Sequence, residues 1–302
     1  APKILKQQET MNFLKALFGG SEENPEEEKK IDTAKQFDML KYDGVKAMKI
    51  GKFDAAVNFF NEALNIKEDV EIHEQLSRVY IALDRMDDAL AELDLLSQAM
   101  PDNISLPLQM AHVAYMKEDY DQMIDICERA LAIDENNARV HYFYAQALIG
   151  KDEPVNAVAR LTKAISLDER SGDAHLLRGQ TLYKMGDMGG ALTDVKWLLD
   201  HVQPQEDVML LAARVMHAGG NDEVAQNLYN VIIEMNPFHL DAYRERGKIR
   251  FDKGDKQGAQ EDMQKVLELD PQAAADINGD FSAEGIEERV KKAYSAMNPF
   301  GL

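Results

Sequence analysis

Three histidines, His73, His141 and His175, have a spacing that could support metal chemistry. They lie 68 and 34 residues apart, at one recurring position of a periodic sequence. Imidazole nitrogens are good zinc ligands, so such a series could form a ladder of metal sites. Equivalent residues of neighbouring helix pairs lie about 10 Å apart, the distance between packed helices, which is too far for them to share one ion. The sequence therefore predicts three packed or half-buried imidazoles and no metal site.

A second candidate for metal chemistry is the polar segment at residues 276–287. Its oxygen-bearing side chains have the 1, 3, 5, 7 and 12 spacing of a calcium loop. They are Asp276, Asn278, Asp280, Ser282 and Glu287. The sixth place of such a loop needs glycine for its sharp turn, and Phe281 would be strained there. We interpret the segment as a polar linker in which Ser282 caps a final helix.

Motifs for catalysis or cofactor binding are absent from the sequence. It has no phosphate-binding loop, no dinucleotide-binding glycine motif, and no HExxH, GxSxG or CxxC. The single cysteine, Cys127, excludes an intrachain disulfide, and it is expected to be a buried small hydrophobe. We therefore expect a protein that is not an enzyme and uses no cofactor. A catalytic or metal-binding protein with a dispersed site is the less favoured alternative.

The charge of the chain favours protein partners. Its 302 residues include 54 acidic and 34 basic side chains, which give a net charge of −20. Such a surface repels phosphate backbones and anionic lipids. We therefore expect no nucleic acid and no membrane as partner, but a protein or peptide ligand that is apolar or basic.

Targeting signals give a further expectation. No apolar stretch reaches the 18 residues of a membrane-spanning helix. Met11 is the expected native start, with residues 1–10 as an upstream extension. We expect a cytoplasmic protein, and export by a removed signal stays open as an alternative.

A repeat of 34 residues predicts the elements that must position the candidate residues. Small, alanine and bulky residues recur in seven units, spaced by 33 residues once and then by 34 residues five times. The units begin at Phe37, Val70, Ile104, Ala138, Gly172, Glu206 and Leu240. A period of this length is typical of a helical solenoid, in which each unit buries its apolar face only against its neighbours.

Each unit divides into two helices of roughly a dozen residues. Gly51, Gly186 and Gly254 can take the positive φ that ends a first helix, and Asp187 and Asp255 can cap the second. Prolines mark boundaries between units, because proline cannot continue a helix. These are Pro101, Pro237 and Pro271. The pattern predicts fourteen short helices and a last one near residues 282–296.

These observations predict an all-α, right-handed α-solenoid with a C-terminal capping helix. Residues 1–30 are expected to form a flexible N-terminal segment and acidic linker. Residues 31–271 are expected to form the seven repeats, and residues 272–302 a linker, the capping helix and a C-terminal tail.

The units resemble tetratricopeptide (TPR) repeats over about residues 37–271. The small eighth position of the family is matched by Gly44, Ser77, Ala111, Ala145, Gly179, Ala213 and Gly247. The alanine at the twentieth position is matched by Ala56, Ala89, Ala157, Ala191, Ala225 and Ala259, whereas the third unit has Met123. Bulky residues at the twenty-fourth position run from Phe60 to Met263, and aliphatic residues at the twenty-seventh from Ala63 to Val266.

The resemblance implies a partner-binding groove. In this family the first helix of each unit lines a concave face, so the fifth, ninth and twelfth positions of units three to six become the candidate site. They are Leu108, His112, Tyr115, Tyr142, Gln146, Ile149, Leu176, Gln180, Tyr183, Leu210, Arg214 and His217. This is an apolar and aromatic strip with polar side chains beside it, suited to an extended or helical apolar peptide. The predicted function is a protein–protein interaction scaffold.

The family's carboxylate clamp is not matched. Lys41 fits its first lysine, but Val45 stands where an asparagine is needed and Gln75 replaces a second asparagine. An acidic C-terminal tail is therefore not the expected ligand of the groove.

An architectural, self-associating subunit is the alternative function. The apolar residues between Phe13 and Phe18 could dock in the groove of the same chain or of a neighbour. Contacts through the ends or the convex side are the other form of this alternative.

Overall fold

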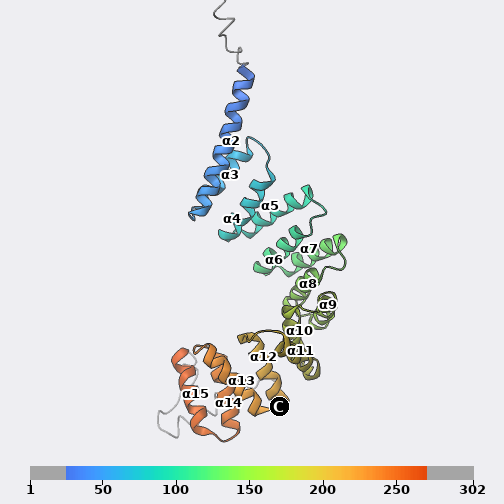
Figure 1. Cartoon of the computed structure of the whole chain (residues 1–302), viewed down its shortest axis with the longest axis vertical. Helices are drawn as coiled ribbons and strands as arrows, with labels where there is room; N and C mark the ends of the chain where they lie inside the picture. Colours follow the sequence, from blue (N-terminus) through green and yellow to red (C-terminus); the bar gives the residue numbers. More distant parts are fainter. Residues whose placement is uncertain (1–24, 271–302) are drawn as a thin grey trace, which may run out of the picture. The chain divides into compact units, whose positions relative to one another are not determined.

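The structure is a computed structural model that describes residues 25–270. Over this range fourteen α-helices follow one another through short connections (Figure 1). The apolar segment near Phe13, the polar segment at residues 276–287 and the capping helix near residues 282–296 lie outside the described residues. The helices pair as seven helix-turn-helix repeats, so the predicted all-α repeat architecture is confirmed.

The chain divides into two compact units between residues 133 and 134, and each unit is described by itself. The described part of the first unit holds three helix pairs. They are α2 (Pro25–Lys49) with α3 (Phe53–Leu64), α4 (Val70–Ala82) with α5 (Met86–Ala99), and α6 (Ser105–Met116) with α7 (Tyr120–Ile133).

The described part of the second unit holds four helix pairs. They are α8 (Ala138–Gly150) with α9 (Pro154–Leu167), α10 (Gly172–Lys184) with α11 (Met188–His201), α12 (Glu206–Ala218) with α13 (Asp222–Met235), and α14 (Leu240–Asp252) with α15 (Lys256–Leu269). Within a unit each helix packs against the next one along the chain.

Local sequence explains where the first helices begin. The side chains of Asp69, Asn137 and Ser171 each accept a hydrogen bond from the backbone N–H three residues later. Such caps satisfy N–H groups that have no partner within the helix. These three helices begin at the predicted unit starts, as do α12 and α14, and α6 begins one residue after the predicted Ile104.

The first repeat differs from the prediction. Its first helix, α2, begins at Pro25, so residues 25–30 are helical rather than part of a flexible linker, and the predicted boundary at residue 31 is too late. Proline suits the first turn of a helix, where its missing N–H costs no hydrogen bond. Even α2, at 25 residues, is too polar to cross a membrane, and no other described helix combines the necessary length and apolar character.

The turn after each first helix requires a left-handed backbone. As predicted, Gly51, Gly186 and Gly254 adopt positive φ values of 73°, 83° and 84°. Gly220 also adopts a positive φ, and in the other three repeats the residues with positive φ are Asp84, Glu118 and Asp152. The next helix then starts with the predicted caps, since the carboxylates of Asp187 and Asp255 accept hydrogen bonds from Gly190 and Gly258, both at 2.9 Å.

The repeated small and bulky positions form the core. Every residue at the twentieth, twenty-fourth and twenty-seventh positions is buried, including Met123 and Cys127. Close packing explains the small eighth position: a Cβ added to Gly44 would lie 2.5 Å from the ring of Phe60. Two helices can approach this closely only where one side chain is small.

Candidate functional site

One predicted groove residue of the first unit belongs to the core. Leu108 is only 8% exposed, and neighbouring residues of α6 are also buried. Its assignment to the binding surface was therefore wrong, because the fifth position of this repeat faces other helices. His112 and Tyr115 lie on the exposed side of the same helix, with Tyr115 41% exposed.

The other nine predicted residues lie in the second unit, and all are partly exposed. They are Tyr142, Gln146 and Ile149 on α8, Leu176, Gln180 and Tyr183 on α10, and Leu210, Arg214 and His217 on α12. We call this set the first-helix face.

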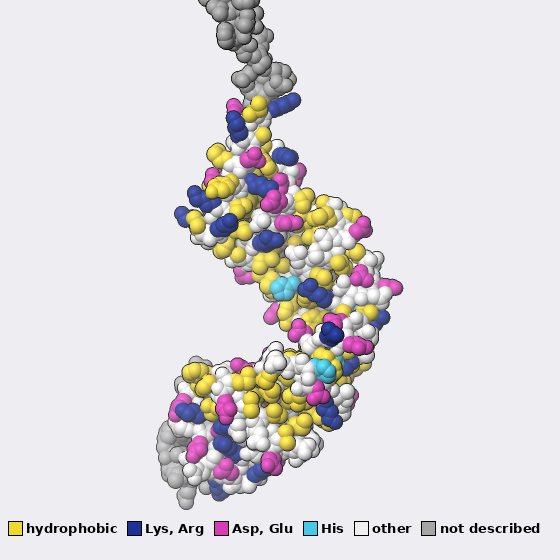
Figure 2. Space-filling model, viewed as in Figure 1, with side chains coloured by type: hydrophobic (Ala, Val, Ile, Leu, Met, Phe, Trp, Pro, Cys, Tyr) yellow, Lys and Arg dark blue, Asp and Glu magenta, His cyan; other side chains and the backbone are white. Residues whose placement is uncertain are grey.

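The apolar members of the first-helix face are anchored on the core beneath them. Leu176 and Tyr183 pack against the buried cluster that includes Leu198, and Leu210 packs against the cluster that includes Tyr229. Figure 2 shows hydrophobic side chains gathered on the surface around α12. These side chains are thus held in place from below while part of each remains open to a partner.

Contacts between α12 and α14 bring further residues to this face. The Nε of Arg214 donates to the carboxylate oxygens of Glu245 at 2.9 and 3.1 Å, and Nη2 of Arg214 lies 3.4 Å from Asp241. The hydroxyl of Tyr229 donates to Glu245 at 2.6 Å. Arg214, predicted as a polar residue of the binding groove, therefore already has carboxylate partners within the unit.

The pKa shifts agree with this arrangement. Burial lowers the pKa of Arg214, but the hydrogen bonds to Glu245 and the charges of Glu245 and Asp241 together raise the pKa above its ordinary value. Burial and the charge of Glu245 raise the pKa of Tyr229 and of Tyr183. The two tyrosines therefore stay neutral near pH 7, and the partly exposed Tyr183 offers an apolar ring with a polar tip.

Two lysines on first helices, Lys41 on α2 and Lys248 on α14, are also paired within the chain. Lys41 contacts Asp69 at 3.0 Å and Glu71 at 2.7 Å, and Lys248 contacts Asp252 at 2.8 Å. Lys41 therefore has carboxylate partners without any ligand, in keeping with the unmatched carboxylate clamp.

The three recurring histidines are packed within their own repeats. His141 and His175 are buried and His73 is half-buried. His73 contacts Glu92 at 2.5 Å and His175 contacts Asp194 at 2.7 Å, each on the second helix of its repeat. Among the described residues no three His, Cys, Asp or Glu side chains are grouped as metal ligands would be.

Two buried carboxylates were missed by sequence reasoning. Asp194 and Asp262 are 0% and 2% exposed, and they are held by Arg178 and Arg246, each 16 residues earlier. The same arginines reach back to Thr162 and Asn230 on the preceding second helices. A shared Arg–Asp spacing of 16 residues in two repeats was the signal that could have revealed them.

Two family models for tetratricopeptide repeats match the chain, at residues 47–109 and 240–273. A curated relative, DnaJ homolog subfamily C member 3 of Gallus gallus, is 22% identical over 173 residues. The match covers 51% of this chain and 34% of the relative, so the aligned region spans about a third of the relative's length.

Solved structures show the same fold. The C-terminal part of a TPR repeat-containing protein from Cytophaga hutchinsonii is 17% identical, with a TM-score of 0.61, covering 82% of this chain and 98% of that chain. PilW, a widely conserved type IV pilus biogenesis factor, is 21% identical, with a TM-score of 0.59, covering 71% and 96%.

Such repeats generally mediate protein–protein interactions and are typically non-catalytic. With seven helix pairs in register, the small and bulky positions buried as the repeat requires, and these matches in sequence and fold, the chain is a tetratricopeptide repeat protein.

Proposed function

We propose that the first-helix face of α8, α10 and α12 binds an apolar segment of a partner protein. One observation carries this proposal: the apolar side chains at its fifth and twelfth repeat positions stay partly exposed, while those at the twentieth, twenty-fourth and twenty-seventh positions are buried. Rows of partly exposed aromatic and aliphatic side chains are typical of binding surfaces, where they act as anchors.

The chemistry of the first-helix face favours an apolar ligand over an acidic one. Tyr142, Leu176 and Tyr183 offer apolar area beside the amides of Gln146 and Gln180. The guanidinium of Arg214 is held by Glu245 and Asp241, so its charge is largely compensated within the unit.

The net charge of −20 further favours a segment flanked by basic residues.

Arg214 joins α12 to α14 and thereby supports the surface.

A groove variant with a matched control tests the proposal. The full chain carrying Tyr142→Ala, Leu176→Ala and Tyr183→Ala is compared with one carrying Val155→Ala, Leu199→Ala and Val224→Ala. The control removes exposed apolar side chains from the second helices α9, α11 and α13. A partner captured from the native lysate by the wild type and the control, and lost by the groove variant while circular dichroism stays unchanged, supports the proposal. Equal capture by all three proteins contradicts it.

Self-association through the N-terminal end is a second candidate function, and α2 favours it. Ile31, Met39, Tyr42 and Ile50 are 54–66% exposed on or directly after this helix. They recur at helical spacing on one side, a pattern expected of a face that another chain covers. Light scattering of the full chain and of a Met39→Ser, Tyr42→Ser variant tests it, since a monomer at all concentrations contradicts self-association.

A further inference from the structure

α2 as a whole carries six lysines and six acidic residues, but three of those acidic residues, Glu26, Glu27 and Glu28, lie in its first turn, and the stretch from Lys29 to Lys52 is basic in an acidic chain. Residues 29–52 contain seven lysines against three aspartates, although the chain as a whole has a net charge of −20. Lys41 is paired with Asp69 and Glu71. Among the residues whose side chains the structure describes, none forms an ion pair with Lys30 or Lys67. Lys30 lies on α2, and Lys67 lies in the segment that follows α3.

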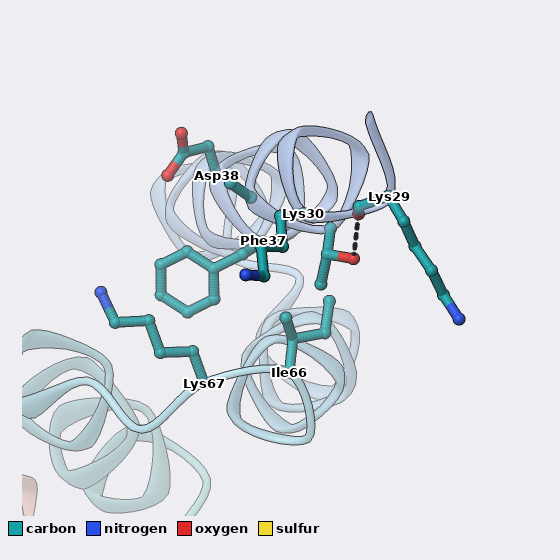
Figure 3. A pocket seen from close by; sticks show the side chains of 8 residues that line it. Lys29, Lys30, Phe37, Asp38, Ile66 and Lys67 are labelled. Atoms are coloured by element: carbon teal, nitrogen blue, oxygen red, sulfur yellow. Dashed lines mark hydrogen bonds between the residues drawn. The ribbon is translucent and has the colours of Figure 1, made fainter. Parts of the chain in front are cut away.

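These two lysines border a pocket of about 610 Å³ between α2 and the segment that follows α3. Its lining includes Lys30, Phe37, Ile66 and Lys67, and we call it the lysine pocket. Figure 3 shows the amines of Lys30 and Lys67 on either side of the Phe37 ring, whereas Lys29 points away from this ring. A volume of this size lies within the range of ligand-binding pockets, roughly 300–1,000 Å³.

The pocket combines an apolar floor with positive walls. Phe37 and Ile66 both line the pocket; Phe37 is 7% exposed and Ile66 is half-buried. The Nζ of Lys67 lies 5.6 Å from the centre of the Phe37 ring, close enough for a cation–π contact that holds the ammonium over the floor. Among the described residues of the lining Asp38 is the acidic one, and Figure 3 shows its carboxylate directed away from Lys30 and Lys67.

The extension of α2 explains why the pocket exists. The helix begins at Pro25, well before the repeat start at Phe37, whereas α3 ends at Leu64. The N-terminal turns of α2 therefore extend beyond its partner helix. The side of α2 that would otherwise be packed is left as the open wall of the pocket.

We propose that the lysine pocket binds a short acidic segment of a partner protein that carries one or two apolar side chains. The apolar residues would lie on Phe37 and Ile66, and the carboxylates would pair with Lys30 and Lys67. Charge complementarity selects this ligand, because an acidic segment is repelled by most of the chain and attracted here. The site differs from the first-helix face in location and in the charge of its ligand.

Fluorescence anisotropy with the full chain tests the proposal. The probe is a fluorescein-labelled peptide, Glu-Asp-Leu-Phe-Glu-Asp, titrated at about 50 and about 200 mM salt. A Lys30→Glu, Lys67→Glu variant should weaken binding about tenfold or more, because it reverses both charges of the pocket. The control variant, Lys46→Glu with Lys49→Glu, changes the net charge by the same amount on exposed positions of α2 outside the pocket. It should weaken binding less than about twofold.

Two further peptides separate the contributions to binding. A peptide with serine in place of leucine and phenylalanine should bind about tenfold more weakly if the apolar floor takes part. A peptide with glutamine and asparagine in place of the acids should lose binding as well. No binding of the first peptide by the wild type overturns the proposal, as does equal weakening by the two lysine variants. All four lysines in the variants are exposed, and circular dichroism confirms that both variants are folded.

Discussion

The repeats that begin at Val70 and Ala138 place a histidine at the same position and shift its pKa in opposite directions. Burial lowers the pKa of His73, but the hydrogen bonds to Glu68 and Glu92 and the charges of these two residues together raise the pKa above its ordinary value. Burial also lowers the pKa of His141, and the charges of Arg160 and Lys163 lower it further. The fold determines that the imidazole is packed, and the side chains around it determine which protonation state is favoured.

One repeat position on the second helix contributes to this difference in the histidine pKa. Glu92 and Arg160 each lie 19 residues after their histidine. The repeat that begins at Gly172 has Asp194 at this position, where it contacts both His175 and Arg178. The same repeat position therefore places a different charge near the histidine in each of three repeats: Glu92 is anionic, Arg160 is cationic, and Asp194 is anionic and fully buried.

Removal of the buried carboxylate should have the largest effect. Asp194→Ala leaves Arg178 and His175 without their shared partner in a desolvated site, so we expect a loss of about 3–5 kcal/mol in the free energy of unfolding. Urea denaturation followed by circular dichroism measures it. Asp200→Ala, an exposed position of the same helix, is the control and should change stability by less than about 0.5 kcal/mol. A cost below about 1 kcal/mol for Asp194→Ala would show that the cluster contributes little.

The same three repeats also differ in the residue that adopts positive φ in the turn after the first helix. The repeats of His73 and His141 use Asp84 and Asp152 at positive φ, whereas the repeat of His175 uses Gly186. Gly186→Ala should destabilise the protein by about 1 kcal/mol through backbone strain alone, because no atom would contact the new Cβ. Thermal unfolding measures the change.

A nearby glycine is the matched control for the turn. Gly189→Ala lies in α11 and meets only an ordinary contact at 3.7 Å. It should be neutral or stabilising by up to about 1 kcal/mol, since alanine favours helix. Equal destabilisation by both variants would contradict the strain argument.

Replacement of the positive charge of Arg160 by a negative one should raise the lowered pKa of His141. In Arg160→Glu an acidic side chain replaces the guanidinium, so the pKa of His141 should rise, as Glu92 helps to raise that of His73. The loss of the contact between Arg160 and the ring of Tyr144, at 4.0 Å, should cost about 0.5–1 kcal/mol. NMR titration of the imidazole protons measures the pKa. An unchanged value would mean that burial alone controls it.

The smallest expected effect is on the pH dependence of stability. The raised pKa of His73 means that the folded protein holds this proton more tightly than the unfolded chain. Its contribution is fully present below the unfolded pKa of about 6.5 and is lost as the pH rises through the folded value. His73→Gln should therefore cost more stability at about pH 5.5 than at about pH 8.5.

His141→Gln should show the opposite pH dependence. Because the folded pKa is lowered, the unfolded chain takes up the proton first as the pH falls through about 6.5, and the native histidine loses stability there. The cost of the substitution should therefore shrink toward acid. Urea midpoints measured at both pH values test the pair, and parallel curves for the two variants would contradict the assigned directions.

The candidate site could be predicted only in part. The repeat register located Tyr142, Leu176 and Tyr183 on partly exposed positions of first helices. It could not show that Leu108 is buried, because the same repeat position can face solvent or a neighbouring helix. Nor could it show that Arg214 is held by Glu245, 31 residues later, since such a pair forms only when two first helices lie side by side. Whether the first-helix face binds a partner stays a prediction.

The sequence by itself determined the repeat, the core positions and most of the first-helix starts. Small and bulky residues recur every 34 residues because packed helix pairs need them there, and caps such as Asp69 act within a few residues. The tertiary structure alone decided which charges meet, which way the pKa of each packed histidine shifts, and that the early start of α2 opens a pocket beside Phe37. These properties depend on side chains that are distant in the chain and come together only when the helices pack.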